Sequence, residues 1–570
     1  MATRGEAEFL NLPFQAKLDF LYGLPARTKR DLILSAPEAE RLVQSFSPET
    51  LFYTLKEIGQ ADSGDLLEMA LPEQVKGLFD LDCWNKDRPN LDRMREWLES
   101  MAEGGRRRIA DSLMELDLEL VTLFLRQYVR VYRLDEAQAA LDVLSRDVLQ
   151  LDEQYVIEFI RRDNVLPVVQ EFIEEVFERD YDYYASLLEE IYWGVEAELE
   201  EQAFAFRSAR LSDRGFPDYY AAQDVFAYLN PRQFLEIRRN YDTPSREDLL
   251  TDEELGAPEL SLVDSGPDTS LFNAALTAGF AAHGKRQLRS EMALVTNQVL
   301  VARSIDFGDP AAVHEAVELT HHFLNLGLEN LAAGDLRSAI EHLRDTHLKL
   351  LFRLGVSLTI DLRKRAQETV RKLGFSAERT TAISYLDTPY GEALAGFLQR
   401  MPRFFAGLDD RRAVVMRDFA TMRDVHLGYA MLEQIEAIPA LFAAIGRIDL
   451  ASPGFRSAVA GREVKLSQIL ITTLVNSVLD GRLAPEPLAA RRLNEIRATL
   501  MTRSDGPAGL TDAFHAHVEQ TLRRELDDDV RMRSADYVNA CLNLFEEEFA
   551  ELDRDREIDP RFVRSILVRA

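Results

Sequence analysis

The sequence YASLLEEIYWGVEAEL, residues 184–199, carries the periodicity that decides the fold class of this chain. Its large apolar side chains recur every three or four residues, which is the spacing of one buried face of a helix. They are Tyr184, Leu187, Leu188, Ile191, Val195 and Leu199. The same spacing returns in residues 313–331 and 336–350, whereas no alternating stretch bounded by Asn-Gly or Asp-Gly turns predicts a β-hairpin. The chain is therefore predicted to be all-α.

The length and the charge of the chain restrict both its architecture and its partners. Its 570 residues exceed the size at which one hydrophobic core stops growing, about 250–300 residues, so several domains are expected. It contains 97 acidic and 67 basic residues, a net charge of −30, which repels the phosphates of nucleic acids. Apolar residues make up 46% of the chain, too many for a disordered protein. We expect a folded protein that does not bind nucleic acid.

The cysteines and the N-terminal residues bear on the cellular compartment. Cys83 and Cys541 are the only cysteines, so neither a disulfide framework nor a zinc cluster is expected. Asn11 and Pro13 interrupt the one apolar stretch near the N-terminus, and no run approaches 18 apolar residues. These features predict a soluble, cytoplasmic protein without membrane insertion.

Prolines mark helix starts in the N-terminal part of the chain. Helices are expected to restart near Pro37, Pro48, Pro72 and Pro89. Ser47 can cap the helix that begins at Pro48, and Ser35 with Glu38 has the spacing of a capping box. Helices this short need neighbours to stack on, which favours superhelical repeats. The alternative is an irregular helical domain whose prolines happen to fall at helix starts.

The motif Leu71-Pro72-Glu73 adds a family resemblance to this N-terminal part. Residues 34–130 resemble the cytoplasmic N-terminal superhelical domain of bacterial magnesium transporters, but the membrane segments are absent and transport is not implied. Over its full length the chain also resembles a bacterial family of unknown function, which implies a shared helical fold and no particular activity. The blocks that carry this second resemblance are residues 210–231, 327–331, 351–358 and 387–402.

Composition divides the chain into five parts. Residues 242–270 hold nine acidic residues, one basic residue and three prolines, a composition typical of a flexible linker. Softer boundaries fall at residues 451–454 and around residues 503–509. The predicted parts are a short-helix repeat domain (1–150), an acidic helical domain (151–241), the linker (242–270), a helical bundle (271–450) and a C-terminal helical subdomain (451–570), whose last helix should start at the cap Asp559.

Histidines gather in a predicted helical hairpin over residues 311–353, which is the weak candidate for a metal site. Glu318 and His321 have the spacing of half a di-iron site, and His347 lies in the apolar register of the second helix. The alternative is a solvated helix face plus one core histidine. Because carboxylate-x-x-His pairs are no more frequent here than chance predicts, no metal site is expected. A metal-binding helical-bundle enzyme centred on this hairpin stays the second hypothesis.

Motifs for catalysis are weak. Residues 279–286 match the glycines and Lys285 of a phosphate-binding loop, but Arg286 stands where a Ser or Thr must bind Mg²⁺, and the preceding residues are expected to be helical. No G-x-S-x-G elbow is present. No cofactor and no catalytic residue are therefore predicted. Catalytic residues can also assemble from distant positions, so the question of an enzyme stays open at this point.

An acidic and aromatic stretch, residues 171–201, is the candidate partner-binding surface. It holds twelve carboxylates, one basic residue and several aromatic side chains. Charge of one sign with aromatic anchors suits a basic protein partner, although a solvated helix face is the alternative. The candidate residues are Glu189, Glu190, Tyr192, Trp193, Glu200 and Glu201. The leading hypothesis is a non-catalytic helical scaffold or regulatory protein, and the sequence indicates no oligomeric state.

Overall fold

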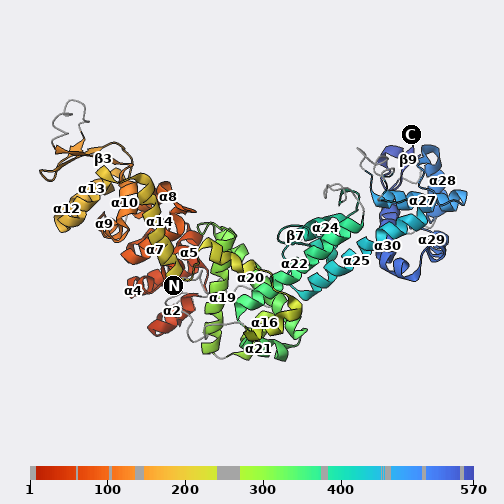
Figure 1. Cartoon of the computed structure of the whole chain (residues 1–570), viewed down its shortest axis with the longest axis horizontal. Helices are drawn as coiled ribbons and strands as arrows, with labels where there is room; N and C mark the ends of the chain where they lie inside the picture. Colours follow the sequence, from red (N-terminus) through yellow and green to blue (C-terminus); the bar gives the residue numbers. More distant parts are fainter. Residues whose placement is uncertain are drawn as a thin grey trace. The chain divides into compact units, whose positions relative to one another are not determined.

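The computed structural model describes residues 8–22, 24–59, 62–101, 106–134, 147–240, 270–280, 282–373, 383–450, 452, 455, 464–502, 509–552 and 557–569 (Figure 1). Of these residues 71% are helical, which confirms the predicted all-α class. The chain forms two compact units, Met1–Leu354 and Gly355–Ala570. The boundary between the units falls within helix α22 (Leu348–Lys372).

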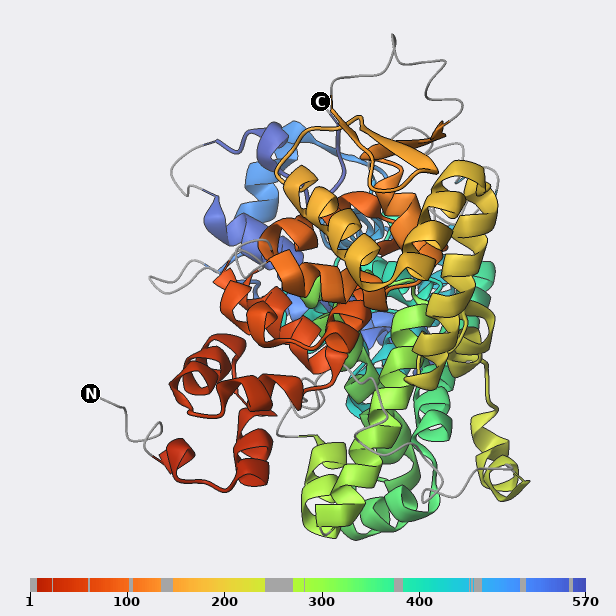
Figure 2. The same ribbon diagram turned by 90° about the vertical axis from the view of Figure 1, so that its left-hand side faces the viewer.

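Unit 1 begins with a stack of short helices. They are α2 (Phe14–Tyr22), α3 (Ala26–Ser35), α4 (Ala39–Gln44), α5 (Pro48–Ile58), α6 (Gly64–Met69), α7 (Pro72–Asp82), α8 (Leu91–Met101), α9 (Arg106–Glu115) and α10 (Leu118–Leu125). Helix α3 packs on α5, α5 on α7 and α7 on α9. Figure 2 shows them in red to orange, one against the next. Some of them also pack on later helices, α9 on α12 (Leu166–Arg179) and α10 on α14 (Glu196–Asp213).

Two of the predicted helix starts are confirmed. Helix α5 begins at Pro48, and the Ser47 hydroxyl accepts a hydrogen bond of 3.1 Å from the Thr50 amide. Helix α7 begins at Pro72, where the Gln74 side chain accepts from the Leu71 amide at 2.8 Å. The Gln74 amide group also donates to two carbonyls at the end of α4, so one buried side chain caps its own helix and binds a neighbour.

The predicted Ser35–Glu38 capping box does not form, whereas the helix expected near Pro89 does follow it. Ser35 ends α3 instead of capping the next helix, because its hydroxyl donates to the carbonyl of Leu32 within the last turn. Pro89 belongs to a strand, and α8 starts two residues later. The strand-edge position suits a proline because it needs no amide donor there.

Short strands occur where no hairpin was expected. β1 (Trp84–Asn85) pairs antiparallel with β2 (Arg88–Pro89). A three-stranded antiparallel sheet has the order β3 (Val129–Arg133), β5 (Tyr155–Phe159), β4 (Val148–Leu149). The sequence VRVYR of β3 does alternate, but over five residues and without a turn signal. Helix α13 packs against β3, so tertiary contacts stabilise these strands.

Longer helices follow the sheet. They are α12 (Leu166–Arg179), α13 (Tyr181–Trp193), α14 (Glu196–Asp213), α15 (Tyr219–Gln223) and α16 (Phe234–Asn240). The stripe predicted over residues 184–199 is therefore two helices, broken at Gly194 and Val195. Tyr184, Ile191 and Leu199 are buried as expected, whereas Val195 is 54% exposed.

Helices from both sides of residues 242–270 pack in the same unit. Apart from Ser270, the predicted linker lies outside the described residues. After it come α18 (Leu271–Gly279), α19 (Ala282–Ala302), α20 (Pro310–Ala332), α21 (Leu336–Asp345) and α22. α15 packs on α19, and Leu229 and Phe234 share a buried cluster with Leu350 and Leu354. A helix, α18, precedes the glycine-lysine motif at 279–286, as the sequence indicated.

Unit 2 is also mainly helical. Its elements are α24 (Tyr390–Phe397), β6 (Phe404–Phe405), β7 (Met416–Arg417), α25 (Met422–Ile445), α27 (Leu466–Asp480), β8 (Leu488–Ala489), α28 (Leu493–Leu500), α29 (Asp512–Glu525), α30 (Asp528–Glu551) and β9 (Val568–Arg569). The long helices α25 and α30 pack together. Asp559 caps as expected, but only one short 3₁₀ turn, Pro560–Phe562, follows it before β9 pairs with β8.

None of the described helices is both long and apolar enough to cross a lipid bilayer.

The shared core predicts how the chain behaves after a cut. A specific protease site inserted after Gly256 should give two fragments on a denaturing gel that still elute together on a sizing column. The reason is that α15 and α16 on one side pack against α19 and α22 on the other. Phe234→Asp places a charge in that cluster and should let the fragments separate. Separation of the cut wild-type chain would contradict the common core.

Candidate interaction surface

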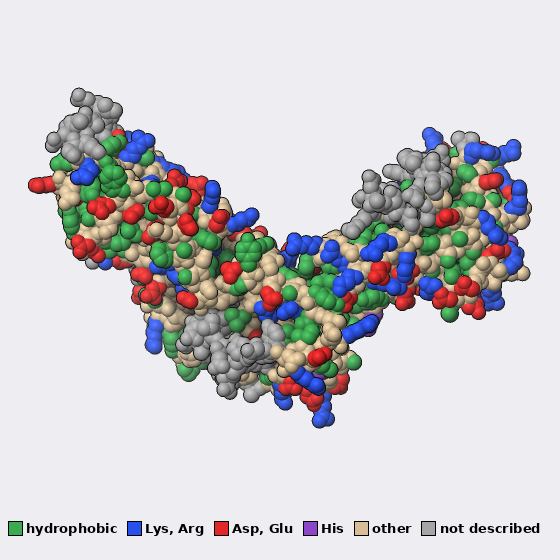
Figure 3. All heavy atoms as spheres, viewed as in Figure 1, with side chains coloured by type: hydrophobic (Ala, Val, Ile, Leu, Met, Phe, Trp, Pro, Cys, Tyr) green, Lys and Arg blue, Asp and Glu red, His purple; other side chains and the backbone are tan. Residues whose placement is uncertain are grey.

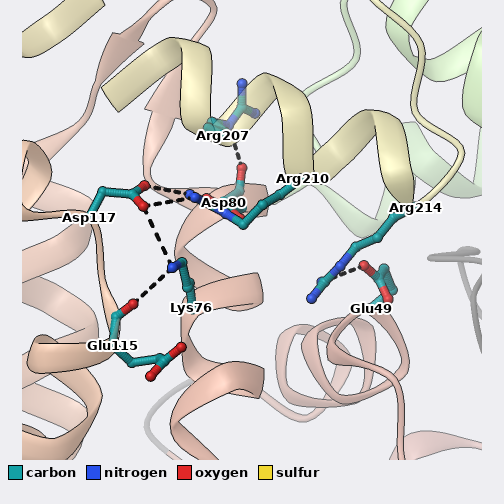
Figure 4. Close-up of polar contacts among 8 residues, drawn as sticks. All are labelled: Glu49, Lys76, Asp80, Glu115, Asp117, Arg207, Arg210 and Arg214. Carbon is teal, nitrogen blue, oxygen red and sulfur yellow. Dashed lines mark hydrogen bonds and ion pairs between the residues drawn. The ribbon is translucent and has the colours of Figure 1, made fainter. Parts of the chain in front are cut away.

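Helix α14 carries three arginines on its inner face. Arg207, Arg210 and Arg214 are spaced three and four residues apart, so they share one side of the helix. Figure 4 shows Arg210 and Arg214 reaching carboxylates of the short-helix part, and Arg207 hydrogen-bonded to the backbone of Asp80. Arg210 donates to both oxygens of Asp80 at 2.8 Å, and to both oxygens of Asp117 at 2.9 and 2.7 Å. One guanidinium thus joins α14 to α7 and to the start of α10.

Arg210 is half-buried, and the Asp80 carboxylate that it binds is buried. Burial lowers the pKa of the Arg210 guanidinium, but its hydrogen bonds to Asp80 and Asp117 outweigh burial, and the net shift is upward. Arg207 donates to the backbone carbonyl of Asp80 at 2.7 Å, and burial lowers its pKa to about 10. Lys76 lies 3.5 Å from Asp117. Both carboxylates of this network are bound by cations of the same unit, so the network links α14 to the short helices.

Arg214, directly after α14, forms a further contact between this helix and the short helices. Its guanidinium donates at 2.9 Å to Glu49, whose side chain is 1% exposed. Gly77 of α7 faces this pair. A Cβ at Gly77 would lie 2.4 Å from Pro48 Cβ and 2.7 Å from the Arg214 guanidinium. Only glycine lets α5, α7 and the end of α14 approach this closely.

A fourth arginine fixes the turn between α13 and α14. Arg126, at the end of α10, donates to the carbonyls of Glu190 and Gly194 at 2.7 and 2.6 Å. It therefore supplies a donor to the Gly194 carbonyl beyond the end of α13, and a second donor to the Glu190 carbonyl, which also accepts from the Gly194 amide at 2.9 Å. A Cβ at Gly194 would lie 2.5 Å from the Glu190 carbonyl, so a larger residue does not fit. The backbone of the turn is held in one position.

This turn presents large apolar side chains to solvent. Trp193 is 68% exposed and Val195 is 54% exposed. The Tyr192 ring stands perpendicular to the Trp193 ring, at 89° with 4.7 Å between centroids. We call Tyr192, Trp193 and Val195 the aromatic corner. Exposed apolar groups that adjoin one another are typical of binding sites.

Carboxylates flank the aromatic corner in the sequence, and Arg126 binds its backbone. Between Arg179 and Arg207 the sequence has eight carboxylates and no lysine or arginine: Asp180, Asp182, Glu189, Glu190, Glu196, Glu198, Glu200 and Glu201. Within the described ranges, none of the eight forms an ion pair with a lysine or arginine. Figure 3 shows acidic and hydrophobic side chains mixed over the end of unit 1 that carries α12 and α13. We call the aromatic corner with these carboxylates the acidic-aromatic surface.

The structure places the six predicted partner-binding residues on or near this turn. Glu189, Trp193 and Glu201 are exposed, and Glu190, Tyr192 and Glu200 are half-buried. Sequence reasoning missed the exposure of Val195, which the helical stripe assigned to the core. It also left out Glu196 and Glu198, which are exposed, and Arg126, which is distant in the sequence. The signal for Val195 is the glycine directly before it, at which a helix can end.

The three candidate metal ligands lie in different surroundings. Glu318 is exposed on α20, whereas His321 is buried with its ring 6.1 Å from the Phe272 ring. His347 is 2.9 Å from the carboxylate of Glu291 on α19. In the part of the chain that the structure describes, no group of three or more His, Cys, Asp or Glu side chains could hold a metal ion.

Neither cysteine has the environment of a nucleophile. Cys83 and Cys541 are both buried, and burial raises the pKa of each thiol. A reactive cysteine needs the opposite shift. A hollow of about 620 Å³ beside α3 and α6 is open, and its Arg30 is bound to Asp65 at 2.6 Å. This polar hollow does not resemble an apolar catalytic pocket.

Comparison with known proteins gives a family but no activity. A family model described as a family of unknown function (DUF6178) matches residues 6–569. This confirms the full-length resemblance seen in the sequence. No curated protein and no solved structure matches the chain. The resemblance of residues 34–130 to a transporter domain stays a prediction.

The Arg210 network predicts a large local effect of one substitution. Arg210→Met should lower the free energy of opening of α14 by about 3–5 kcal/mol, because buried Asp80 and partly buried Asp117 lose their shared cation. Hydrogen exchange of the α14 amides measures this quantity. Arg232→Met is the control, since Arg232 is exposed and has no ion pair with the described residues; it should change the same value by less than about 0.5 kcal/mol.

The same substitution in an Asp80→Asn variant separates the contribution of charge to the opening free energy of α14 from that of packing. In a chain that carries Asp80→Asn, Arg210→Met should cost less than in the wild type, because one buried carboxylate fewer is left unpaired. If Arg210→Met alone lowers the opening free energy by less than about 1 kcal/mol, apolar contacts hold α14 and the ionic network does not.

Proposed function

This chain belongs to the family of unknown function whose model spans it, and from its surface we propose a non-catalytic helical scaffold or regulatory protein that binds a basic protein partner. The observation that carries the proposal is the aromatic corner, where Trp193 is 68% exposed and the flanking carboxylates form no ion pair with a lysine or arginine among the described residues. Exposed apolar groups that adjoin one another are typical of interaction sites.

The chemistry of the acidic-aromatic surface indicates the kind of partner. An arginine or lysine of the partner can lie over the exposed face of Trp193, where the ring attracts a cation. The carboxylates of Glu189, Glu196 and Glu198 raise the rate of encounter with a positively charged partner. Val195 supplies apolar contact area beside the ring. A segment that combines arginine or lysine with small apolar residues fits this surface best.

The rigidity of the turn supports the same proposal. Arg126 holds the backbone of the turn, and Arg210 holds α14 against the short helices. A surface that is already ordered loses less conformational entropy on binding. The partner therefore meets a preformed site.

The second hypothesis, a metal-binding enzyme centred on residues 311–353, has less support. Glu318 faces solvent while His321 packs against an aromatic ring, and His347 is paired with Glu291. The three side chains do not converge on one point. A cytoplasmic location is part of our proposal, because both cysteines are free and buried.

A photo-crosslinking amino acid at Val195 identifies the partner in the native cell. It should capture a protein whose crosslinked peptide contains lysine or arginine. The same amino acid at Met532, which is 70% exposed in unit 2, is the matched control and should not capture that protein. Equal capture from both positions, or a crosslinked peptide without basic residues, would contradict the proposal.

Binding kinetics with the captured partner then test the role of the carboxylates in association and the role of Trp193 in dissociation separately. Reversing Glu189, Glu196 and Glu198 to lysine should slow association by about tenfold or more at low salt, with a smaller effect at high salt. The control reverses three exposed carboxylates elsewhere in unit 1, Glu68, Glu99 and Glu315, and should change the rate little.

Truncating the aromatic anchor should act on dissociation. Trp193→Ala should speed dissociation by about tenfold or more, which corresponds to an interface residue worth over 1.4 kcal/mol. Because Trp193 is exposed in the free protein, the melting temperature should stay unchanged. An unchanged dissociation rate would show that the corner is not the contact.

A further inference from the structure

Unit 2 carries an exposed apolar and basic loop. Residues 406–415 connect β6 to β7, and Val414 and Val415 are 75% and 60% exposed. Arg411 and Arg412, directly before them in sequence, are exposed as well. We call these four residues the arginine-valine loop. Among described residues, no carboxylate forms an ion pair with Arg411 or Arg412.

The arginine-valine loop is held by its own hydrogen bonds. The Ala406 amide donates to the Val415 carbonyl at 3.0 Å, and the Ala413 amide donates to the Asp410 carbonyl at 2.9 Å. Next to the loop, Arg417 of β7 forms two hydrogen bonds of 2.7 Å with Asp424. The exposure of the valines is therefore a property of an ordered loop.

The charge around this loop is opposite to that of the acidic-aromatic surface. Residues 400–424 contain six arginines and four aspartates, in a chain whose net charge is −30. Three of the arginines pair with aspartates: Arg403 with Asp418, Arg417 with Asp424 and Arg423 with Asp409. The pairs leave Arg411, Arg412 and exposed Arg400 against Asp410, so the loop presents net positive charge beside apolar side chains.

We propose that the arginine-valine loop binds the acidic-aromatic surface of a second copy of this chain. This inference rests on the proposed function, since it names one partner for the same surface. The loop carries groups that complement the acidic-aromatic surface. Its guanidinium groups can lie over Trp193 and bind the carboxylates, and its two valines can contact Val195. Each surface leaves apolar groups in water, and their contact covers both.

The net charge of the chain does not prevent this contact. At 0.15 M ionic strength the Debye length is about 8 Å, so charges farther from the interface are largely screened. Only the local charges count at contact, and these are opposite in sign. Self-association should therefore be strongest at intermediate salt. In very low salt the long-range repulsion is unscreened, and in high salt the local attraction is screened.

The contact is heterologous, because two different surfaces meet. Each copy that binds through its loop still offers its acidic-aromatic surface, so association continues to longer chains or closes into a ring. A few side chains on each side make a small interface, and small interfaces give weak, transient association. We expect reversible assembly that grows with protein concentration.

Two variants of the full-length chain, each lacking one surface, test this geometry. The surface variant carries Trp193→Ala, Glu189→Gln, Glu196→Gln and Glu198→Gln. The loop variant carries Arg411→Gln, Arg412→Gln, Val414→Ser and Val415→Ser. Sedimentation velocity should show the wild type growing in average mass with concentration and each variant alone staying monomeric. Their equimolar mixture should form a 1:1 dimer and nothing larger, because only one complementary pair remains.

The control with Glu68, Glu99 and Glu315 changed to glutamine should assemble as the wild type does. A wild type that stays monomeric at all concentrations and salt conditions would overturn this inference, while crosslinking of a basic protein at Val195 would still support the proposed function. Assembly of either variant alone to the wild-type extent would also overturn it, because assembly would then use other surfaces. Circular dichroism of each variant confirms that its fold is intact.

Discussion

Arg210 donates four hydrogen bonds to the carboxylates of Asp80 and Asp117, and the placement of α14 depends on them. The helix buries only two leucines and an alanine, so its apolar contacts contribute about 4–5 kcal/mol at about 2 kcal/mol per leucine. Breaking a buried ion pair costs a similar amount, about 3–5 kcal/mol. Apolar contacts tolerate small rotations and shifts of a helix, whereas a guanidinium shared by two carboxylates does not. The ionic contact therefore sets the register in which α14 lies on the short helices.

The exposed corner follows from the same constraint. Helix α14 cannot shift because of Arg210, and the end of α13 cannot shift because Arg126 binds its last carbonyls. The two-residue turn between them has no freedom to move Trp193 or Val195 into the core. Stability of the framework and exposure of the site thus have one cause. An apolar side chain in water is tolerated here because the backbone around it is held by buried charges.

The sequence predicted the helical class but not every helix boundary. Apolar spacing identified the buried faces of α13 and α20, and prolines gave the starts of α5 and α7. Spacing alone treated residues 184–199 as one helix, since Val195 falls in register with Ile191. The break depends on Gly194, where only a residue without Cβ fits beside the Glu190 carbonyl. Short strands such as β3 escaped notice because contacts with distant residues stabilise them, which local patterns do not encode.

The candidate site was predictable in composition and not in geometry, and α14 shows why. Its first six residues hold four glutamates, whereas its three inner-face arginines lie at 207, 210 and 214, and this segregation is visible in the sequence. The helix dipole favours acids in the first turn and bases in the last, which accounts for part of it. What the sequence does not give is the partner of each charge, because Arg210 meets carboxylates 130 and 93 residues away. The arginines find buried acids in the framework, and the glutamates find no cation among the described residues. Within one helix, the paired half therefore belongs to the fold, and the unpaired half is where the proposed binding surface lies.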